Sequence, residues 1–291
     1  MNLFNRLLNA SPRSVGRWIR RSIGFPPTRL ASTPPPAWER IAAGPLAGRE
    51  VLIGRQGSGA WEDMIAGRFD AEIYPLLANE IGGVVWDVGA HIGFHTLGFA
   101  AIVGPTGHVV AFEPNPSNRE RLRQNLDRNA DLAARVEILP CALSDRDGDS
   151  SFVFSGDIES GASSMSFLDG TTPAIDFDTA AAWNTVVVPV RTTDALIREA
   201  AVPAPQLIKI DVEGAELLVL RGAVEMVRRS RPAVIVEAHS ARLAFEVTQW
   251  LHTQGYDVRV LADLAPSRVL LTAQLQTFTH SSLAPPIPPS A

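Results

Sequence analysis

The sequence predicts an α/β fold in which buried strands alternate with helices. Two stretches indicate it: residues 84–93 and 207–216 each begin as an apolar run of strand length and continue, after a turn, into a helical segment. A third observation is that acidic residues stand where these strands end. Because open α/β sheets bind ligands at the carboxyl ends of their strands, we expect the functional site at that edge.

Bulk composition agrees with one large folded domain plus extensions. The chain has 291 residues, of which 46% are hydrophobic and 20% are charged. A net charge of −5 argues weakly against nucleic acid as the main partner, because phosphate binding needs clustered basic residues. The single cysteine, Cys141, allows no internal disulfide and indicates a reducing compartment, so we expect a cytoplasmic location. No apolar run approaches the roughly 20 residues of a membrane helix.

The N-terminal segment 1–37 differs from the rest, because it is rich in arginine and contains no acidic residue. A helix starting near Ser11 would be basic and amphipathic, and a proline-rich linker follows it. Such a helix could lie on an anionic membrane or a partner, act as a transit peptide, or cap the main domain or stay partly disordered. We expect a main domain over 38–282 and a disordered tail over 283–291.

The first functional stretch contains a glycine turn. Gly89 and Gly93 let the backbone turn sharply after Asp87, and the N–H groups of the next helix, predicted over 94–103, point toward an anion. Asp87 would repel a pyrophosphate but attract an ammonium or sulfonium group. A ligand with both a carboxylate and a cationic amine fits this turn, and S-adenosylmethionine (SAM) has both.

Two further acids follow the next two strands. Glu113 ends the strand predicted over 108–112, about 20 residues beyond the glycines, where a carboxylate can accept from both hydroxyls of a ribose. Asp145 follows the strand predicted over 136–139 and is placed either to accept from an adenine amine or simply to form a turn.

The remaining elements have weaker sequence signals. We predict strands over 50–53, 186–190, 233–237, 256–261 and 269–278, a glycine and serine turn at 57–59, and helices over 70–81, 117–129 and 241–253, with a further helix ending near Arg228. The segment 155–185 is rich in small and polar residues, and we expect either a mobile lid over an acceptor site or a disordered insertion.

The second functional stretch brings polar residues onto two strands. Lys209 and Asp211 share one face of a strand, and Glu237 and His239 share one face of the next. Because an unpaired buried charge is costly, we expect Lys209 and Glu237 to form an ion pair. Asp211 and His239 lie nearer the carboxyl edge of the sheet, so they are the candidate catalytic residues.

Together these motifs closely resemble the FkbM-type SAM-dependent methyltransferases. The resemblance covers roughly residues 65–261, and it is carried by the segments 86–93, 112–115, 208–216 and 231–237. The segment 208–216 is much more specific than the glycine turn. It implies a class I methyltransferase fold, a Rossmann-like doubly wound sheet of seven strands with the last strand antiparallel. It also implies O-methylation of a hydroxyl on a sugar, glycan or polyketide-type product.

The resemblance also implies where the cofactor binds. The candidate SAM-binding residues are Asp87, Gly89, His91, Gly93, Glu113 and Asn115, with Asp145 contacting the adenine. His91 departs from the pattern, since the family usually has asparagine there. Because asparagine and histidine are both enriched at positive φ, we expect the backbone to turn in the same way. The N-terminal helix and the segment 155–185 have no clear counterpart in the family.

Two other classes of protein are alternatives. A short-chain NAD(P) dehydrogenase would need a Tyr-x-x-x-Lys pair, but the tyrosines are Tyr74 and Tyr256 and the lysine is Lys209. A catalytically silent SAM-binding or membrane-docked interaction module is the second alternative, and methyl transfer to an acceptor would exclude it.

The catalytic step has two alternative interpretations. In the first, His239 or Asp211 removes the acceptor proton directly; His239 would then act as a neutral imidazole with a pKa of about 6 to 7. In the second, Asp211, Glu237 and His239 hold a divalent cation that acidifies the hydroxyl. We favour the metal-free base and assign no metal ligand, because the expected ion pair between Lys209 and Glu237 would compete for one ligand.

Overall fold

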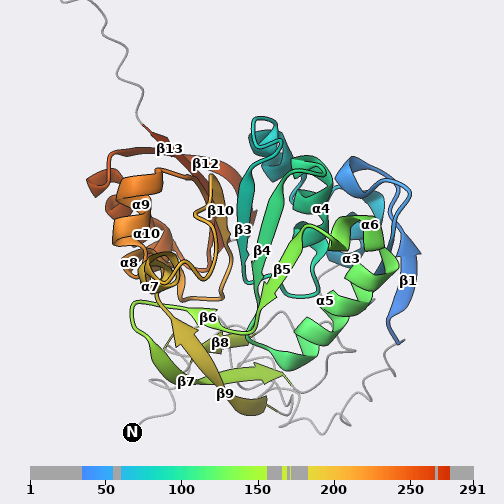
Figure 1. Ribbon diagram of the computed structural model, residues 1–291, viewed down its shortest axis with the longest axis horizontal. Coiled ribbons are helices and arrows are strands. Elements are labelled where there is room, and N and C mark those ends of the chain that lie inside the picture. Colours follow the sequence, from blue (N-terminus) through green and yellow to red (C-terminus); the bar gives the residue numbers. More distant parts are fainter. Residues whose placement is uncertain are drawn as a thin grey trace, which may run out of the picture. The chain divides into compact units, whose positions relative to one another are not determined.

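A seven-stranded sheet forms the centre of the structure, a computed structural model that describes residues 35–54, 60–155, 166–168, 171, 183–265 and 268–275 (Figure 1). Its strands are β3 (Val84–Val88), β4 (His108–Phe112), β5 (Val136–Leu139), β10 (Leu207–Ile210), β11 (Ala233–Ala238), β12 (Tyr256–Ala265) and β13 (Arg268–Leu275). The spatial order is β12-β13-β11-β10-β3-β4-β5, and β13 runs antiparallel to both of its neighbours. The expected doubly wound fold with an antiparallel last strand is confirmed.

Helices cover both faces of this sheet (Figure 1). One face carries α3 (Ala60–Ala66), α4 (Phe94–Val103), α5 (Pro116–Arg128), α6 (Ala130–Ala133) and the 3₁₀ helices η1 (Gly44–Leu46) and η2 (Ala71–Leu77). The other carries α7 (Thr193–Arg198), α8 (Glu216–Arg221), α9 (Val224–Ser230) and α10 (Ala241–Thr253). The side chains of successive strand residues point to opposite faces of the sheet, so they enter different hydrophobic cores. Val85 packs in the core beneath α3 to α6, and Trp86 and Val88 pack in the core beneath α7 to α10.

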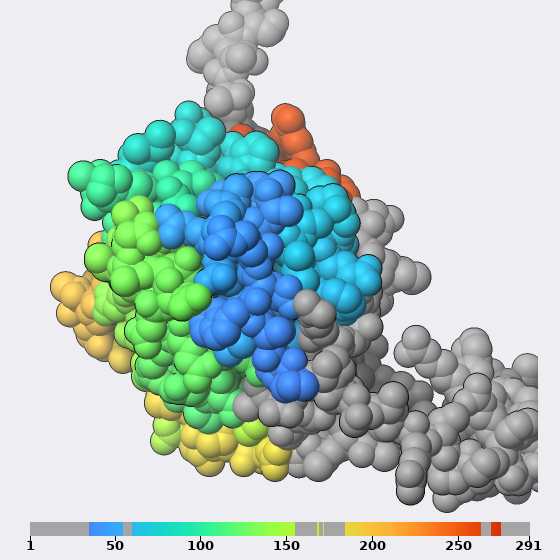
Figure 2. Space-filling model, turned by 90° about the vertical axis from the view of Figure 1, so that its right-hand side faces the viewer, coloured from blue at the N-terminus to red at the C-terminus, as the bar shows by residue number. Residues whose placement is uncertain are grey.

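An N-terminal hairpin adds to the first face. β1 (Ala37–Arg40) pairs antiparallel with β2 (Glu50–Ile53), and Figure 2 shows this segment in blue at the surface beside the green of α5 and α6. Two ion pairs connect the hairpin to those helices: one joins Arg128 and Glu50, and the other is a bidentate pair between Arg49 and Asp131. The sequence predicted β2 but not β1. Within the described ranges, no helix combines the length and apolar character needed to span a bilayer.

A second sheet lies at the carboxyl edge of the main one (Figure 1). Its order is β6-β9-β7-β8, built from β6 (Ala142–Leu143), β7 (Gly148–Ser155), β8 (Ser166–Leu168) and β9 (Trp183–Arg191). Buried Phe152 and Val188 pack with Ala215 from the turn after β10. Where the sequence suggested a lid or an insertion over 155–185, the described parts other than Thr171 are strands. The rest of that segment lies outside the described residues, as do the predicted N-terminal helix, the turn at 57–59 and the tail.

Two helix predictions are corrected. The helix expected over 70–81 is the shorter 3₁₀ helix η2, because Pro75 lies inside it and cannot donate a backbone hydrogen bond. The helix expected to end near Arg228 is divided into α8 and α9 at Gly222. A Cβ atom at Gly222 would lie 1.9 Å from the carbonyl oxygen of Ser144, so the glycine lets this helical segment pass directly against the chain that follows β6.

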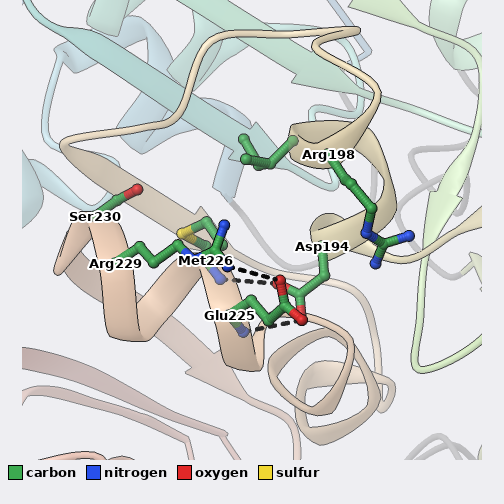
Figure 3. A pocket seen from close by; sticks show the side chains of 7 residues that line it. Asp194, Arg198, Glu225, Met226, Arg229 and Ser230 are labelled. Atoms are coloured by element: carbon green, nitrogen blue, oxygen red, sulfur yellow. Dashed lines mark hydrogen bonds and ion pairs between the residues drawn. The ribbon is translucent and has the colours of Figure 1, made fainter.

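Asp194 of α7 stabilises the N-terminus of α9. Its carboxylate accepts from the backbone N–H groups of Glu225 (2.9 Å) and Met226 (2.8 Å), at the start of α9 (Figure 3). A surface hollow of about 310 Å³ lies beside this contact, between α7 and α9. None of the residues that line the hollow is a candidate site residue, so we assign it no role in the chemistry below.

Candidate active site

The glycines of the turn after β3 are required by packing. Gly89 and Gly93 have φ angles of +85° and +86°. A Cβ atom at Gly89 would lie 1.8 Å from the carbonyl oxygen of Asp211, and one at Gly93 would lie 2.1 Å from a methyl carbon of Leu122. These glycines therefore fit the turn against the end of β10 and against α5, whereas the sequence suggested that they let a ligand approach.

His91 turns the backbone as expected. Its φ is +53°, and its backbone N–H donates to Oε2 of Glu113 over 2.7 Å. Burial, assisted by the positive charge of Arg121, lowers the pKa of the His91 imidazole to about 4, so the ring is neutral. The replacement of the usual asparagine thus leaves the turn intact and adds no charge.

Glu113 joins the two turns that follow β3 and β4. It is 4% exposed, and its Oε1 accepts from the backbone N–H of Asn115 over 2.8 Å. Burial raises the pKa of Glu113 to about 7, and its hydrogen bonds offset only part of that effect. Oε1 also accepts from the side-chain amide of Asn118 over 3.4 Å. Because each carboxylate oxygen can accept two hydrogen bonds, Oε2 keeps capacity for a donor from a ligand.

The first turn of α4 completes this half of the site. Its N-cap residue is Gly93, which provides no side-chain cap, and its first turn contains no acidic residue. Helix N–H groups at such an end attract anions, and α4 is long enough to have a substantial dipole. This half of the site therefore offers an anion site on α4 and a hydroxyl acceptor on Glu113.

Two further predicted cofactor residues are Asn115 and Asp145. Asn115 is fully buried and caps α5, because its Oδ1 accepts from the backbone N–H of Ser117 over 2.9 Å. Asp145 is exposed just after β6, and the hydroxyl of Ser144 lies 3.4 Å from its Oδ1. Asn115 thus has a structural role here, and Asp145 is accessible beyond the end of the β5–β6 segment.

Lys209 connects the two halves of the site. Its Nζ lies 3.5 Å from Oδ1 of Asp87 and 3.1 Å from Oδ2 of Asp211. Burial alone would lower the pKa of Lys209, but the negative charges of Asp211 and Asp87 outweigh it and raise that pKa. The other oxygen of Asp87 accepts from the hydroxyl of Thr96 over 2.6 Å.

In place of the expected ion pair with Glu237, Lys209 forms ion pairs with Asp87 and Asp211. The strand register gives the reason: Lys209 lies directly opposite Asp87 on β3 and opposite Ile235 on β11, two residues before Glu237. Glu237 instead faces His239, with 3.4 Å between its Oε1 and Nε2 of the ring.

His239 lies at the centre of the second half. Its Nδ1 donates to Oε1 of Glu216 over 2.7 Å. Its Nε2 faces Asp211 at 3.6 Å and Glu213 at 3.4 Å, besides Glu237, yet forms no hydrogen bond within the described part of the chain. Burial alone would lower the pKa of His239, but the bond to Glu216 and the surrounding carboxylates raise it to about 9. This differs from the expected value, because the sequence did not show how many carboxylates surround the ring.

Several residues of the site were not singled out from the sequence. Thr96 holds Asp87, and Glu216 holds His239. A buried cluster on η2 and α4 was also missed: Nε2 of His95 lies 3.2 Å from Asp70, and its Nδ1 lies 3.1 Å from the hydroxyl of Tyr74. A signal existed only for Glu216, which belongs to the specific string 208–216.

Comparison with known proteins identifies a family. The model of the methyltransferase FkbM domain matches residues 87–258, a range that includes every candidate site residue. The hexuronic acid methyltransferase AglP of Haloferax volcanii is 33% identical over 186 residues, which cover 63% of this chain and 68% of AglP. The 31-O-demethyl-FK506 methyltransferase FkbM of Streptomyces tacrolimicus is 34% identical over 198 residues, which cover 61% of this chain and 74% of that protein.

A solved structure gives a further comparison. The crystal structure of methyltransferase FkbM from Methylobacillus flagellatus KT aligns with a TM-score of 0.48 and 21% identity. The alignment covers 66% of this chain but 43% of that one, so this chain spans less than half of the longer protein.

Proposed function

This chain belongs to the FkbM methyltransferase family, and from that premise we propose that it transfers the methyl group of SAM to a hydroxyl of a sugar, a glycan or a polyketide-type product. One observation carries the proposal: Asp87, Lys209, Asp211 and His239 follow one another along the carboxyl edge of the sheet at 3.5, 3.1 and 3.6 Å. The residues assigned to the cofactor and those assigned to the acceptor are thereby held side by side.

The residues of the first half fit SAM. The N-terminus of α4, without a capping side chain or an acid, suits the carboxylate of the amino acid part. Glu113 suits the ribose hydroxyls. We assign the ammonium group to the side of Asp87, whose carboxylate is itself fully buried and paired with Lys209. Gly89, His91, Gly93 and Asn115 shape the turns that bear these groups, and Asp145 is accessible for the adenine amine. Bound there, SAM would supply a methyl group already activated on a sulfonium.

The residues of the second half suit an acceptor hydroxyl. Alignment of reacting groups can supply about 7 to 11 kcal/mol, and a positioned base adds about 10²- to 10⁴-fold. Asp211 is partly exposed and can accept a hydrogen bond from the hydroxyl, and His239 adjoins Asp211. The acceptor classes follow the family resemblance and the related proteins, which are named for a hexuronic acid and for 31-O-demethyl-FK506.

The test is methyl transfer from isotopically labelled SAM to panels of uronic acid glycosides, neutral sugars and hydroxylated polyketides, read by mass spectrometry. We expect label on an oxygen of at least one acceptor. Binding of SAM without transfer to any acceptor would favour the catalytically silent module. Label on nitrogen or carbon would contradict O-methylation.

A further inference from the structure

Three side chains at the carboxyl ends of two neighbouring strands can meet at one ion. Asp211 comes directly after β10, and Glu237 and His239 lie two residues apart at the end of β11. Each offers one ligand atom, and these atoms all lie within 4.8 Å of one another. The parallel register brings them together, because Ile210 lies opposite Val236 and the next residues along each strand are Asp211 and Glu237.

The distances suit coordination. Ligand atoms at about 2.0 to 2.2 Å from a metal ion stand about 3 to 4.4 Å from one another. Nε2 of His239 is 3.6 Å from Asp211 and 3.4 Å from Glu237, so both separations fall within that range. Neither contact is a hydrogen bond, so the ring nitrogen is not held by either carboxylate.

The histidine supplies an independent second observation. His239 is 4% exposed, and its Nε2 makes no hydrogen bond among the described residues although it points at the carboxylates. Its other nitrogen is fixed by Glu216, itself fully buried. A carboxylate that holds one ring nitrogen while the other faces the ligand cluster is the usual arrangement behind a metal-binding histidine.

We propose that Asp211, Glu237 and His239 form a divalent cation site, with Glu216 as the residue that positions the histidine. Two carboxylates and one imidazole suit Mn²⁺ and similar divalent ions of the first transition row. The role of the ion rests on the proposed function: it would bind the acceptor hydroxyl and lower its pKa, so that the O–H bond breaks and the proton passes to water. The existence of the site does not depend on that function.

The test measures Mn²⁺ binding to the full chain, freed of metal with a chelator and without SAM, by electron paramagnetic resonance. We expect one bound Mn²⁺ per chain. Glu237→Gln should weaken binding by about tenfold or more, and Glu216→Gln by about 10- to 100-fold through the misplaced histidine. Glu120→Gln removes an exposed carboxylate of α5 and should bind as the parent does. No bound Mn²⁺ at millimolar concentration, or unchanged binding in folded Glu237→Gln, would overturn the proposal.

A second measurement uses the unmodified chain, so it does not depend on whether the variants fold. In the unmodified chain, bound Mn²⁺ should broaden the nuclear magnetic resonance signals of the His239 ring, while those of His108, at the amino end of β4 on the opposite edge of the sheet, stay sharp. Broadening of His108 alone would overturn the site. Methyl transfer that persists in chelator-treated protein would overturn the role of the ion and leave the proposed function standing. Mn²⁺ bound at His239 without any methyl transfer would support the site and contradict the proposed function.

Discussion

The two halves of the active site use their carboxylates differently. In the half formed after β3 and β4, Glu113 receives two backbone N–H groups and Asp87 receives the hydroxyl of Thr96. In the half formed after β10 and β11, carboxylates from three segments surround the ring of His239, whose Nε2 hydrogen-bonds none of them. In the first half, hydrogen bonds from the protein hold the carboxylates in place, whereas the arrangement of the second half suits a bound cation. The comparison suggests that the cofactor half is preformed and that the acceptor half is completed by what it binds.

The largest expected effect is at the contact that joins the halves. Gly89→Ala places a methyl group 1.8 Å from the carbonyl oxygen of Asp211 at a φ of +85°. We expect a loss of about 3 to 5 kcal/mol in the free energy of unfolding, from overpacking and a left-handed backbone together. Chemical denaturation measures it.

The matched control is Gly104→Ala. Gly104 also has a positive φ, +73°, but a Cβ atom there would meet nothing within 4 Å. Gly104 has a ψ of −173°, a backbone conformation that is essentially restricted to glycine, so only a backbone cost of about 1 to 3 kcal/mol should appear. Equal losses for the two variants would show that the contact between Gly89 and Asp211 does not matter.

In the acceptor half, His239→Ala should reduce turnover by about 10²-fold or more while SAM affinity stays within about twofold, because the lost interaction belongs to the acceptor step. Steady-state kinetics on a confirmed acceptor and a SAM titration give the two numbers. A parallel fall in SAM affinity would mean that the halves are not separable.

In the cofactor half, Glu113→Gln should weaken SAM binding by about 1.5 to 3 kcal/mol, the range for a hydrogen bond to a charged group. Turnover at saturating SAM should change much less. Calorimetry with the parent, with Glu113→Gln and with Glu120→Gln as the surface control measures the loss. An unchanged affinity for Glu113→Gln would remove Glu113 from the cofactor site.

A smaller effect is expected from pH. Burial raises the pKa of Glu113 to about 7, and ribose hydroxyls would donate to its charged form, so a bound cofactor should lower that pKa. SAM affinity should therefore fall as pH decreases below about 7, by at most about tenfold per pH unit, and level off above it. The slope should be absent in Glu113→Gln; the same slope in both proteins would assign it to another group.

Much of this architecture could be predicted because its signals are local. Apolar runs predicted β3, β4, β5 and β10 nearly to the residue, and the acids at their ends marked the functional edge. What failed depends on relations between segments. The partner of Lys209 is set by the register of β10 against β3, which the sequence does not state, and the surroundings of His239 are set by a turn that brings Glu213 and Glu216 back onto the ring.

The second sheet shows another limit. β8 and the start of β9 fall in a segment of small and polar residues whose hydrophobic pattern is weak, and they are held by pairing with β7. Similarly, the division between α8 and α9 depends on Ser144 lying against Gly222, a contact between residues distant in sequence. Local periodicity cannot reveal either feature.

Binding of SAM and its product S-adenosylhomocysteine by calorimetry, with NAD and ATP as competitors, tests the central claim most directly. The cofactor half has an anion site on α4 beside a carboxylate for ribose, and the negative charge of Asp87 disfavours a pyrophosphate. We therefore predict one site per chain for SAM and for S-adenosylhomocysteine, and no binding of NAD or ATP. Tighter binding of NAD than of SAM, or no binding of SAM at all, would contradict the account.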